Sequence, residues 1–203
     1  MSATLAPTTI DRTDVRTILT GGTKVGLATA VAVVLYLWVS KYVPAGGSLR
    51  GGVEALLVLA AGTAVTFLPG RWCAARSVEG IAGAAGMGLW GAIVFSVVDI
   101  VLLRPLKAYP WTWDAVGGGT TWWYLPIWWM FATFLAWMGG TLTAAAPEGW
   151  SVARTAAPVL IGAVVLAVVA RLAGLDGALA VLAGAGFAVT LPVLAVAALA
   201  RKA

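Results

Sequence analysis

The chain lacks histidine altogether and contains a single cysteine, Cys73. Without histidine, it cannot ligate haem or chlorophyll through imidazole, hold a His-based zinc ion or form a Ser-His-Asp triad. A single cysteine excludes both an intramolecular disulfide and a thiolate metal cluster. These absences remove most familiar classes of membrane metalloenzyme, and no catalytic, cofactor-binding or metal-ligating residue stands out.

Charged side chains are scarce as well. They make up 10% of the chain, against roughly a quarter in ordinary globular domains. The 13 basic residues leave a net charge of +5, which is too dilute for nucleic acid binding. Of the two glycine-rich runs, residues 83–88 lie within an apolar segment and residues 117–119 lack the lysine and the following helix of a phosphate-binding loop. We expect neither a nucleic acid nor a nucleotide as a partner.

Apolar residues dominate the chain: 61% of it is hydrophobic and its mean hydropathy is +0.96. A membrane-spanning helix needs about 20 mostly apolar residues. Segments of this kind run over residues 25–43, 52–68, 80–103, 121–143, 152–170 and 178–199. The sequence therefore predicts an all-α fold, a polytopic integral membrane bundle of about six transmembrane helices with short loops, forming one domain over residues 25–203.

Prolines and glycines punctuate these segments. The dipeptides Gly46-Gly47 and Pro69-Gly70 fall between predicted spans, where chain reversal is favoured. The connection between the last two segments is tight and contains Arg171 and Asp176. Those segments are therefore either two full spans or one span followed by a half-inserted hairpin.

The first 24 residues are polar and rich in threonine, and they lack the features of a signal peptide. Within them Ile10, Val15, Ile18 and Leu19 form the apolar side of a short amphipathic helix, which we expect Gly21-Gly22 to end. Six spans place eight basic residues on one side, namely Arg12, Arg16, Lys24, Arg71, Arg76, Arg154, Arg201 and Lys202. Five lie on the other, namely Lys41, Arg50, Arg104, Lys107 and Arg171.

This distribution of basic residues predicts that both termini face the cytoplasm, because cytoplasmic loops carry the excess of lysine and arginine. We expect the protein in a prokaryotic plasma membrane. Small residues recur at helical spacing in the third span (Gly80, Ala84, Gly88) and in the sixth (Ala180, Gly184, Ala188). Such faces allow helix backbones to approach closely, so both spans are expected to pack against neighbours.

Seven of the 11 tryptophans lie close together, in the outer loop 108–121 and the fourth span: Trp111, Trp113, Trp122, Trp123, Trp128, Trp129 and Trp137. Indole favours the boundary between hydrocarbon and water, so a belt that anchors one interface is the simplest interpretation. Trp128, Trp129 and Trp137 lie deeper than a belt requires. Two alternatives stay open for this surface: docking of a partner subunit, and binding of a flat apolar ligand such as a carotenoid, quinone or lipid tail.

Two carboxylates, Glu54 and Asp99, lie inside apolar segments. They are expected at similar depth on neighbouring antiparallel helices, where they can meet. Intramembrane carboxylates are costly and often mark proton or cation paths. The alternative is structural ion pairing, with Arg50 four residues before Glu54 and with Asp99 shallow enough to reach headgroups or Lys107.

Three isolated hydroxyls and the single cysteine give no indication of a catalytic role. We expect the hydroxyls of Ser96, Thr66 and Thr190 to bond to their own helix or to a neighbour. Cys73 lies in a short basic loop beside the membrane, where a lone cysteine is either inert or a site of palmitoylation.

The leading functional interpretation is a non-catalytic integral membrane subunit of a larger complex, which docks through the tryptophan-rich helix and loop and whose partners are membrane lipids and other membrane subunits. The alternative is a small proton- or cation-coupled transporter that uses Glu54 and Asp99. A lipid-modifying enzyme has the least support, because the remaining acid and base groups form no recognisable constellation.

Overall fold

The structure is a computed structural model that describes residues 11–44, 48–106, 108 and 124–201. These residues form six long helices: α1 (Val15–Tyr42), α2 (Ser48–Trp72), α3 (Val78–Val98) with its π-helical continuation η1 (Asp99–Leu103), α5 (Tyr124–Ala145), α6 (Val152–Leu172) and α7 (Leu179–Ala200). All six are long and apolar enough to cross a membrane. The predicted all-α helical bundle is confirmed, and the chain is an integral membrane protein.

The last two segments are separate helices of 21 and 22 residues, each long enough to span. A turn with Gly174 at φ +79° joins them, and glycine adopts this left-handed conformation without the steric cost that other residues meet. The structure thus contains two full-length helices here in place of a hairpin.

The prediction that Gly21-Gly22 ends a short N-terminal helix is wrong, because α1 runs through both glycines. The helix begins at its N-cap Asp14, whose carboxylate accepts a 3.0 Å hydrogen bond from the Thr17 amide. A Cβ atom on Gly22 would lie 2.8 Å from the Met87 carbonyl oxygen of α3. These glycines therefore serve close helix packing instead of helix termination.

Pro69-Gly70 also lies inside a helix, where a break between spans was expected. Pro69 stands in the last turn of α2, and because it has no N–H it removes the one helical hydrogen bond to the carbonyl of Val65. The backbone continues the pattern beyond it, since the Cys73 amide donates to the Pro69 carbonyl at 2.9 Å. A Cβ atom on Gly70 would lie 3.0 Å from Gly140 Cα, which shows how closely α2 approaches α5.

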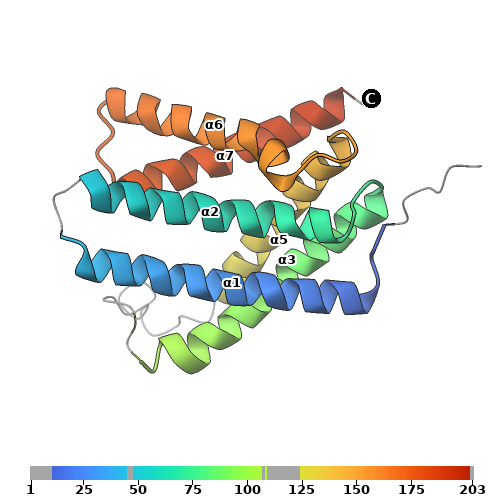
Figure 1. Ribbon diagram of the computed structural model, residues 1–203, viewed down its shortest axis with the longest axis horizontal. Coiled ribbons are helices and arrows are strands. Elements are labelled where there is room, and N and C mark those ends of the chain that lie inside the picture. The colour runs from blue at the N-terminus through green and yellow to red at the C-terminus, as the bar shows by residue number, and fades with distance from the viewer. Residues whose placement is uncertain (1–10, 45–47, 107, 109–123, 202–203) are drawn as a thin grey trace, which may run out of the picture.

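Helix α2 occupies the middle of the bundle and contacts α1, α3, α5, α6 and α7. Figure 1 shows α1 along one side of α2, the α6 and α7 pair along the other, and α3 and α5 crossing obliquely behind. The start of α1 and the end of α7 lie at the same end of the molecule. We call this the N-terminal end, and the other the opposite end.

Small residues mediate the close contacts between helices. Gly80, Ala84 and Gly88 of α3 are all buried, as predicted, and a Cβ atom on Gly88 would lie 2.5 Å from the Cβ of Ala136 in α5. In α7 a Cβ atom on Gly186 would lie 2.6 Å from the Ala163 carbonyl oxygen of α6. Between these contacts lies an apolar core formed by α2, α5, α6 and α7, which includes Phe67, Leu135, Val159, Phe187 and Leu191.

Candidate functional site

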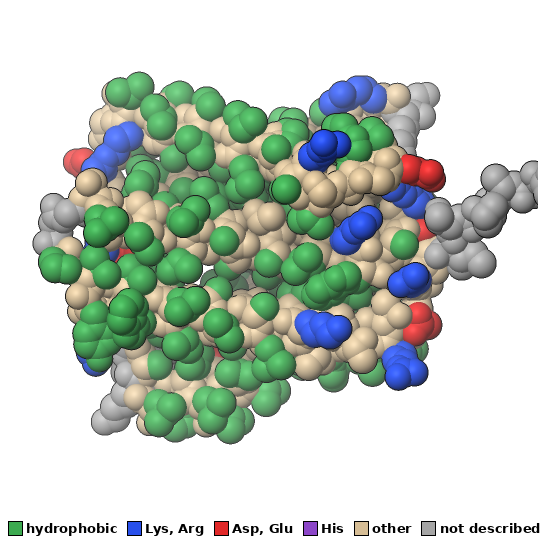
Figure 2. Space-filling view, viewed as in Figure 1, with side chains coloured by type: hydrophobic (Ala, Val, Ile, Leu, Met, Phe, Trp, Pro, Cys, Tyr) green, Lys and Arg blue, Asp and Glu red, His purple; other side chains and the backbone are tan. Residues whose placement is uncertain are grey.

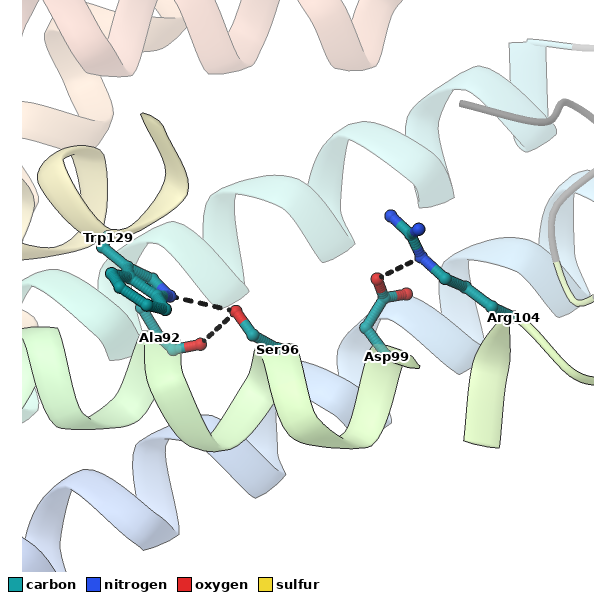
Figure 3. Close-up of polar contacts among 5 residues, drawn as sticks. All are labelled: Ala92, Ser96, Asp99, Arg104 and Trp129. Carbon is teal, nitrogen blue, oxygen red and sulfur yellow. Dashed lines mark hydrogen bonds and ion pairs between the residues drawn. The ribbon is translucent and has the colours of Figure 1, made fainter. Parts of the chain in front are cut away.

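One of the three deep tryptophans of α5 points into the bundle, and the other two are exposed. Trp129 points into the bundle, where its indole Nε1 donates a 3.2 Å hydrogen bond to Ser96 Oγ of α3. Figure 3 shows this contact and the 2.8 Å bond by which Ser96 Oγ donates to the Ala92 carbonyl of its own helix. Trp128 and Trp137 are 41% and 50% exposed. Trp111, Trp113, Trp122, Trp123 and residues 109–121 of the outer loop lie outside the described residues.

The prediction for Ser96 is confirmed, whereas the prediction for Thr66 and Thr190 is wrong. The hydroxyls of both threonines are buried and have no hydrogen-bond partner in the described part of the chain. Each side chain instead lies against a glycine of the neighbouring helix, Gly139 for Thr66 and Gly162 for Thr190. These threonines fill the space over the glycines, and their position is set by packing.

Glu54 takes part in an ion pair at the opposite end of the bundle. Its Oε1 atom accepts hydrogen bonds from Arg50 Nε at 2.9 Å and from Ser40 Oγ of α1 at 2.6 Å. The pairing with Arg50, one of the two alternatives for this carboxylate, is therefore observed. Glu54 is buried, and its bond to Ser40 links α2 to α1.

Asp99 is paired with Arg104, whose Nε donates to Asp99 Oδ2 at 3.1 Å (Figure 3). The π-helix η1 makes this pair possible. In a regular α-helix, residues five apart lie about 140° apart around the axis. The wider turn of η1, in which the Arg104 amide donates to the Asp99 carbonyl at 2.9 Å, brings the two side chains together.

The two carboxylates are thus held in separate ion pairs, and no hydrogen bond or ion pair joins Glu54 to Asp99 in the described ranges. The two carboxylates, which the sequence allowed to meet, are therefore not paired with each other. The sequence placed Arg50 correctly because an i,i+4 pair needs only a regular helix. It did not single out Arg104, because the pairing depends on the π-turn, which leaves no simple sequence signal. Lys107, the other partner considered for Asp99, lies outside the described residues.

A cavity of about 470 Å³ lies among α1, α2, α3 and α5. Four helices line it: Val25, Thr29, Val33 and Tyr36 of α1, Ala61, Gly62 and Val65 of α2, Gly88, Gly91, Ala92 and Phe95 of α3 with Asp99 of η1, and Trp128, Phe131, Ala132 and Leu135 of α5. Its walls are predominantly apolar. Asp99 supplies the charged group of this lining, and it is 97% buried, with an exposed fraction of 3%.

Sequence reasoning missed most of the cavity. The residues of α1 that line it recur every three or four positions, which marks one helix face. The same spacing describes a face turned toward lipid, so periodicity in an apolar span cannot separate the two. Trp128 is the residue shared by the predicted aromatic surface and the observed cavity. The structure thus connects the predicted ligand surface to the interior of the bundle.

A network at the N-terminal end ties the chain segment before α1 to α3. The Asp11 carboxylate accepts hydrogen bonds from the amides of Arg76 at 3.0 Å, Ser77 at 2.9 Å and Gly80 at 3.1 Å. It thereby satisfies amide groups at the start of α3 that have no partner within the helix. Burial acts to raise the pKa of Asp11, but these bonds and one from the Ser77 hydroxyl outweigh it and hold the pKa below its usual value.

Arg76 and Cys73 belong to the same region. The Arg76 guanidinium donates to the carbonyl of Ala146 at 2.6 Å, at the end of α5, where a cation is favourable. Cys73 is fully buried. Burial and the carboxylates of Asp11 and Asp14 raise the pKa of its thiol to about 11. The thiol is therefore protonated and unreactive at neutral pH, which agrees with the inert alternative.

No group of three or more acidic or cysteine side chains that could hold a metal ion occurs among the residues described. Comparisons with protein-family models, curated proteins and solved structures give no match to this chain.

Proposed function

We propose that the protein is a non-catalytic integral membrane protein that holds an apolar small molecule in the cavity among α1, α2, α3 and α5. The single observation that carries this proposal is the cavity itself. Its volume of about 470 Å³ lies within the range of small-molecule sites, roughly 300–1,000 Å³, and such sites are lined mainly by apolar and aromatic side chains.

The energetic cost of an empty cavity supports occupancy. The wall atoms of an unfilled apolar space lack contact partners, which costs dispersion energy. The space here is large, about 470 Å³, and partly open to the surface. Water does not offset this cost in an apolar space. An apolar molecule such as a quinone, a carotenoid or a lipid chain does.

The cavity also favours one orientation of its ligand. Asp99 lines the cavity with its carboxylate held by Arg104, while the aromatic walls formed by Trp128 and Phe131 suit a flat or elongated apolar body. A ligand with a hydrogen-bond donor at one end places that donor at Asp99. The proposal therefore favours an apolar molecule with one polar end.

The test uses a short-chain benzoquinone, and separately a monoacylglycerol, added to the purified full chain in detergent. Binding to the folded state raises the unfolding temperature with ligand concentration. We expect saturable stabilisation by at least one probe, and a smaller response in the variant Ala92→Leu, which adds bulk inside the cavity. Equal responses of this variant and of Ala28→Leu, a control on the exposed side of α1, would contradict the proposal.

A second role, as a subunit of a larger membrane complex, is favoured by Trp137. This side chain is 50% exposed near the middle of α5, and its indole N–H has no acceptor within the described residues. An unpaired N–H that faces the hydrocarbon of the bilayer is costly. A helix of a partner subunit would supply an acceptor.

The subunit role predicts that gentle detergent extraction from the native membrane yields a stable complex larger than the chain alone. Trp137→Leu removes the indole from this surface and is expected to shift the chain toward the monomer. Isolation of the unaltered chain as a monodisperse monomer under the same conditions would count against the role.

We infer further that the N-terminal end faces the cytoplasm of a prokaryotic cell. Basic residues are more numerous at this end, where they include Arg12, Arg16, Arg71, Arg76 and Arg154, and such a bias is typical of the cytoplasmic side. Labelling of Arg154→Cys and Arg171→Cys by an impermeant maleimide in intact cells distinguishes the orientations. Only the Arg171→Cys variant should react, and the reverse pattern would place the N-terminal end outside.

A further inference from the structure

A second concave site lies at the N-terminal end, between the first turns of α1 and the end of α2. This basic groove has a volume of about 530 Å³ and is lined by Arg12, Thr17, Thr20, Lys24, Arg71 and Trp72. Its lining is mainly polar, unlike that of the apolar cavity. Figure 2 shows lysine and arginine side chains gathered over this end of the molecule.

Three cations from three segments converge on the basic groove. Arg12 precedes α1, Lys24 lies within α1, and Arg71 stands in the last turn of α2. The Arg12 amide donates to the Cys73 carbonyl at 2.8 Å, which fixes the backbone of that segment against the end of α2. Lys24 Nζ lies 5.9 Å from the centre of the Trp72 ring. These backbone and ring contacts hold the three cations around one space.

Two carboxylates close to the groove residues in the sequence, Asp11 and Asp14, already accept hydrogen bonds from other groups of the chain. Asp11 accepts hydrogen bonds from the amides at the start of α3, and Asp14 accepts from the amide and hydroxyl of Thr17. Among the residues that the structure describes, no carboxylate lies within ion-pairing distance of Arg12, Lys24 or Arg71. The groove therefore carries positive charge that no residue described here neutralises.

The hydroxyls of the groove do not act as free donors. Thr17 Oγ1 donates to Asp14 at 2.7 Å, and Thr20 Oγ1 donates to the Arg16 carbonyl at 2.7 Å. The donors left for a ligand are the guanidinium and ammonium groups, and such groups bind phosphate strongly. The chemistry thus selects an anion with several acceptor oxygens over a neutral polar molecule.

The position of the groove identifies the source of this anion. Helices begin and end at this level, and tryptophan at a helix end, as at Trp72, is typical of the boundary between hydrocarbon and water. Phosphates of lipid headgroups lie at the same depth, and basic pockets between membrane helices bind anionic headgroups. We propose that the basic groove binds the phosphate of an anionic lipid headgroup.

The experiment measures binding of phosphatidylglycerol and of phosphatidylcholine to the purified full chain by native mass spectrometry. The double variant Lys24→Gln/Arg71→Gln should bind phosphatidylglycerol about thirtyfold more weakly than the unaltered chain, because two of the three cations are lost and each contributes about 1 kcal/mol. The control Arg154→Gln, an exposed basic residue at the same end but outside the groove, should change it less than about twofold. Phosphatidylcholine should bind more weakly to the unaltered chain and respond little to either change.

Equal losses in the double variant and the control would overturn the proposal, since they would assign lipid binding to charge in general. Arg71→Lys keeps the charge and should retain binding, which separates loss of the cation from loss of the fold. Inorganic phosphate is the competing ligand. If millimolar phosphate alone displaces phosphatidylglycerol from the groove, the anion is a soluble phosphate compound and the lipid assignment is wrong.

Discussion

Small residues have opposite effects on helix packing in two regions of this bundle. Between α6 and α7, glycines bring the backbones into contact, as at Gly186 against Ala163. Among α1, α2, α3 and α5, small residues also mediate close contacts, as at Gly22 against α3 and Gly88 against α5. Yet this second region contains a partly open cavity of about 470 Å³.

The difference follows from the number of helices that meet. Two helices can close on a stripe of small residues until their backbones touch. Four helices arranged around a common centre cannot all approach it, and the side chains that point inward must fill the space. At Ala61, Ala92 and Ala132 those side chains are methyl groups. A small residue thus closes a helix pair, whereas in a four-helix ring it leaves room for a ligand.

The largest expected effect on stability comes from enlarging one side chain at the contact of α6 with α7 and, separately, one side chain in the cavity. Gly186→Ala places a methyl group 2.6 Å from the Ala163 carbonyl, a backbone atom that cannot move aside without parting α6 from α7. We expect a loss of about 2 kcal/mol in the free energy of unfolding. Ala92→Leu adds three carbons inside the cavity and should cost less. Unfolding in mixed SDS micelles measures both variants.

The matched control for Gly186→Ala is Gly52→Ala, because a Cβ atom on Gly52 meets no neighbour within 4 Å. In a helix this change alone should stabilise slightly. If Ala92→Leu destabilises the protein more than Gly186→Ala does, then the cavity region is packed as tightly as the helix pair. Small residues would then not have different effects in the two regions.

Acid should loosen the cavity region before the α6 and α7 pair. Because its pKa is lowered in the folded protein, Asp11 contributes stability that is present above its unfolded pKa and is lost as pH falls through its lower folded pKa. The loss therefore begins below about pH 4. Asp11→Asn keeps one acceptor oxygen but removes the charge that strengthens these hydrogen bonds, which should cost about 1 kcal/mol at neutral pH, and it should remove this acid response.

Hydrogen exchange locates the response to acid. The amides of Ser77 and Gly80, which donate to Asp11, should lose protection in Asp11→Asn, while the amides of α7 should keep theirs. A uniform loss of protection over α3 and α7 would show that Asp11 stabilises the whole bundle equally.

Substitution of the inward Trp129 should cost more stability than substitution of the outward Trp137, and this difference should be smaller than the effects above. Trp129→Phe removes the hydrogen bond to buried Ser96, which should cost about 1 kcal/mol in the isolated protein. Trp137→Phe removes an exposed indole and should leave stability nearly unchanged. Equal costs in detergent would mean that Trp137 is also held within the chain.

The smallest expected effect concerns ion flux. Glu54 and Asp99 are each held by an arginine, and such local pairs are structural in our account. We expect no proton or cation flux in proteoliposomes above that of empty liposomes. A flux that Glu54→Gln or Asp99→Asn abolishes would instead favour the small transporter that the intramembrane carboxylates suggest.

Composition and span length predicted the class of fold well. Hydrocarbon requires every backbone polar group to be satisfied within the segment, which leaves long apolar stretches only a helical solution. Helix ends were predicted less well. Glycine and proline were interpreted as breaks at Gly21-Gly22 and Pro69-Gly70, but both pairs lie inside helices. In a membrane bundle these residues also serve close packing, and the sequence does not separate the two uses.

The candidate site was predictable only in part. The Arg50 and Glu54 pair follows from spacing alone, whereas the Asp99 and Arg104 pair needs a π-turn. The cavity depends on how four helices are arranged around one centre. Apolar periodicity identifies one face of a helix but does not predict what that face packs against. Trp129 was recognised as deep, but its bond to Ser96 required the packing of α5 on α3.

The most direct test of the central claim is the amount of apolar molecule that accompanies the chain from its native membrane. The purified protein is extracted into organic solvent, and bound molecules are quantified by mass spectrometry for the unaltered chain, Ala92→Leu and Ala28→Leu. We predict about one molecule per chain for the unaltered protein and the Ala28→Leu control, and a small fraction of that for Ala92→Leu. Equal amounts in all three, or none in the unaltered chain, would contradict the assignment of the cavity as a binding site.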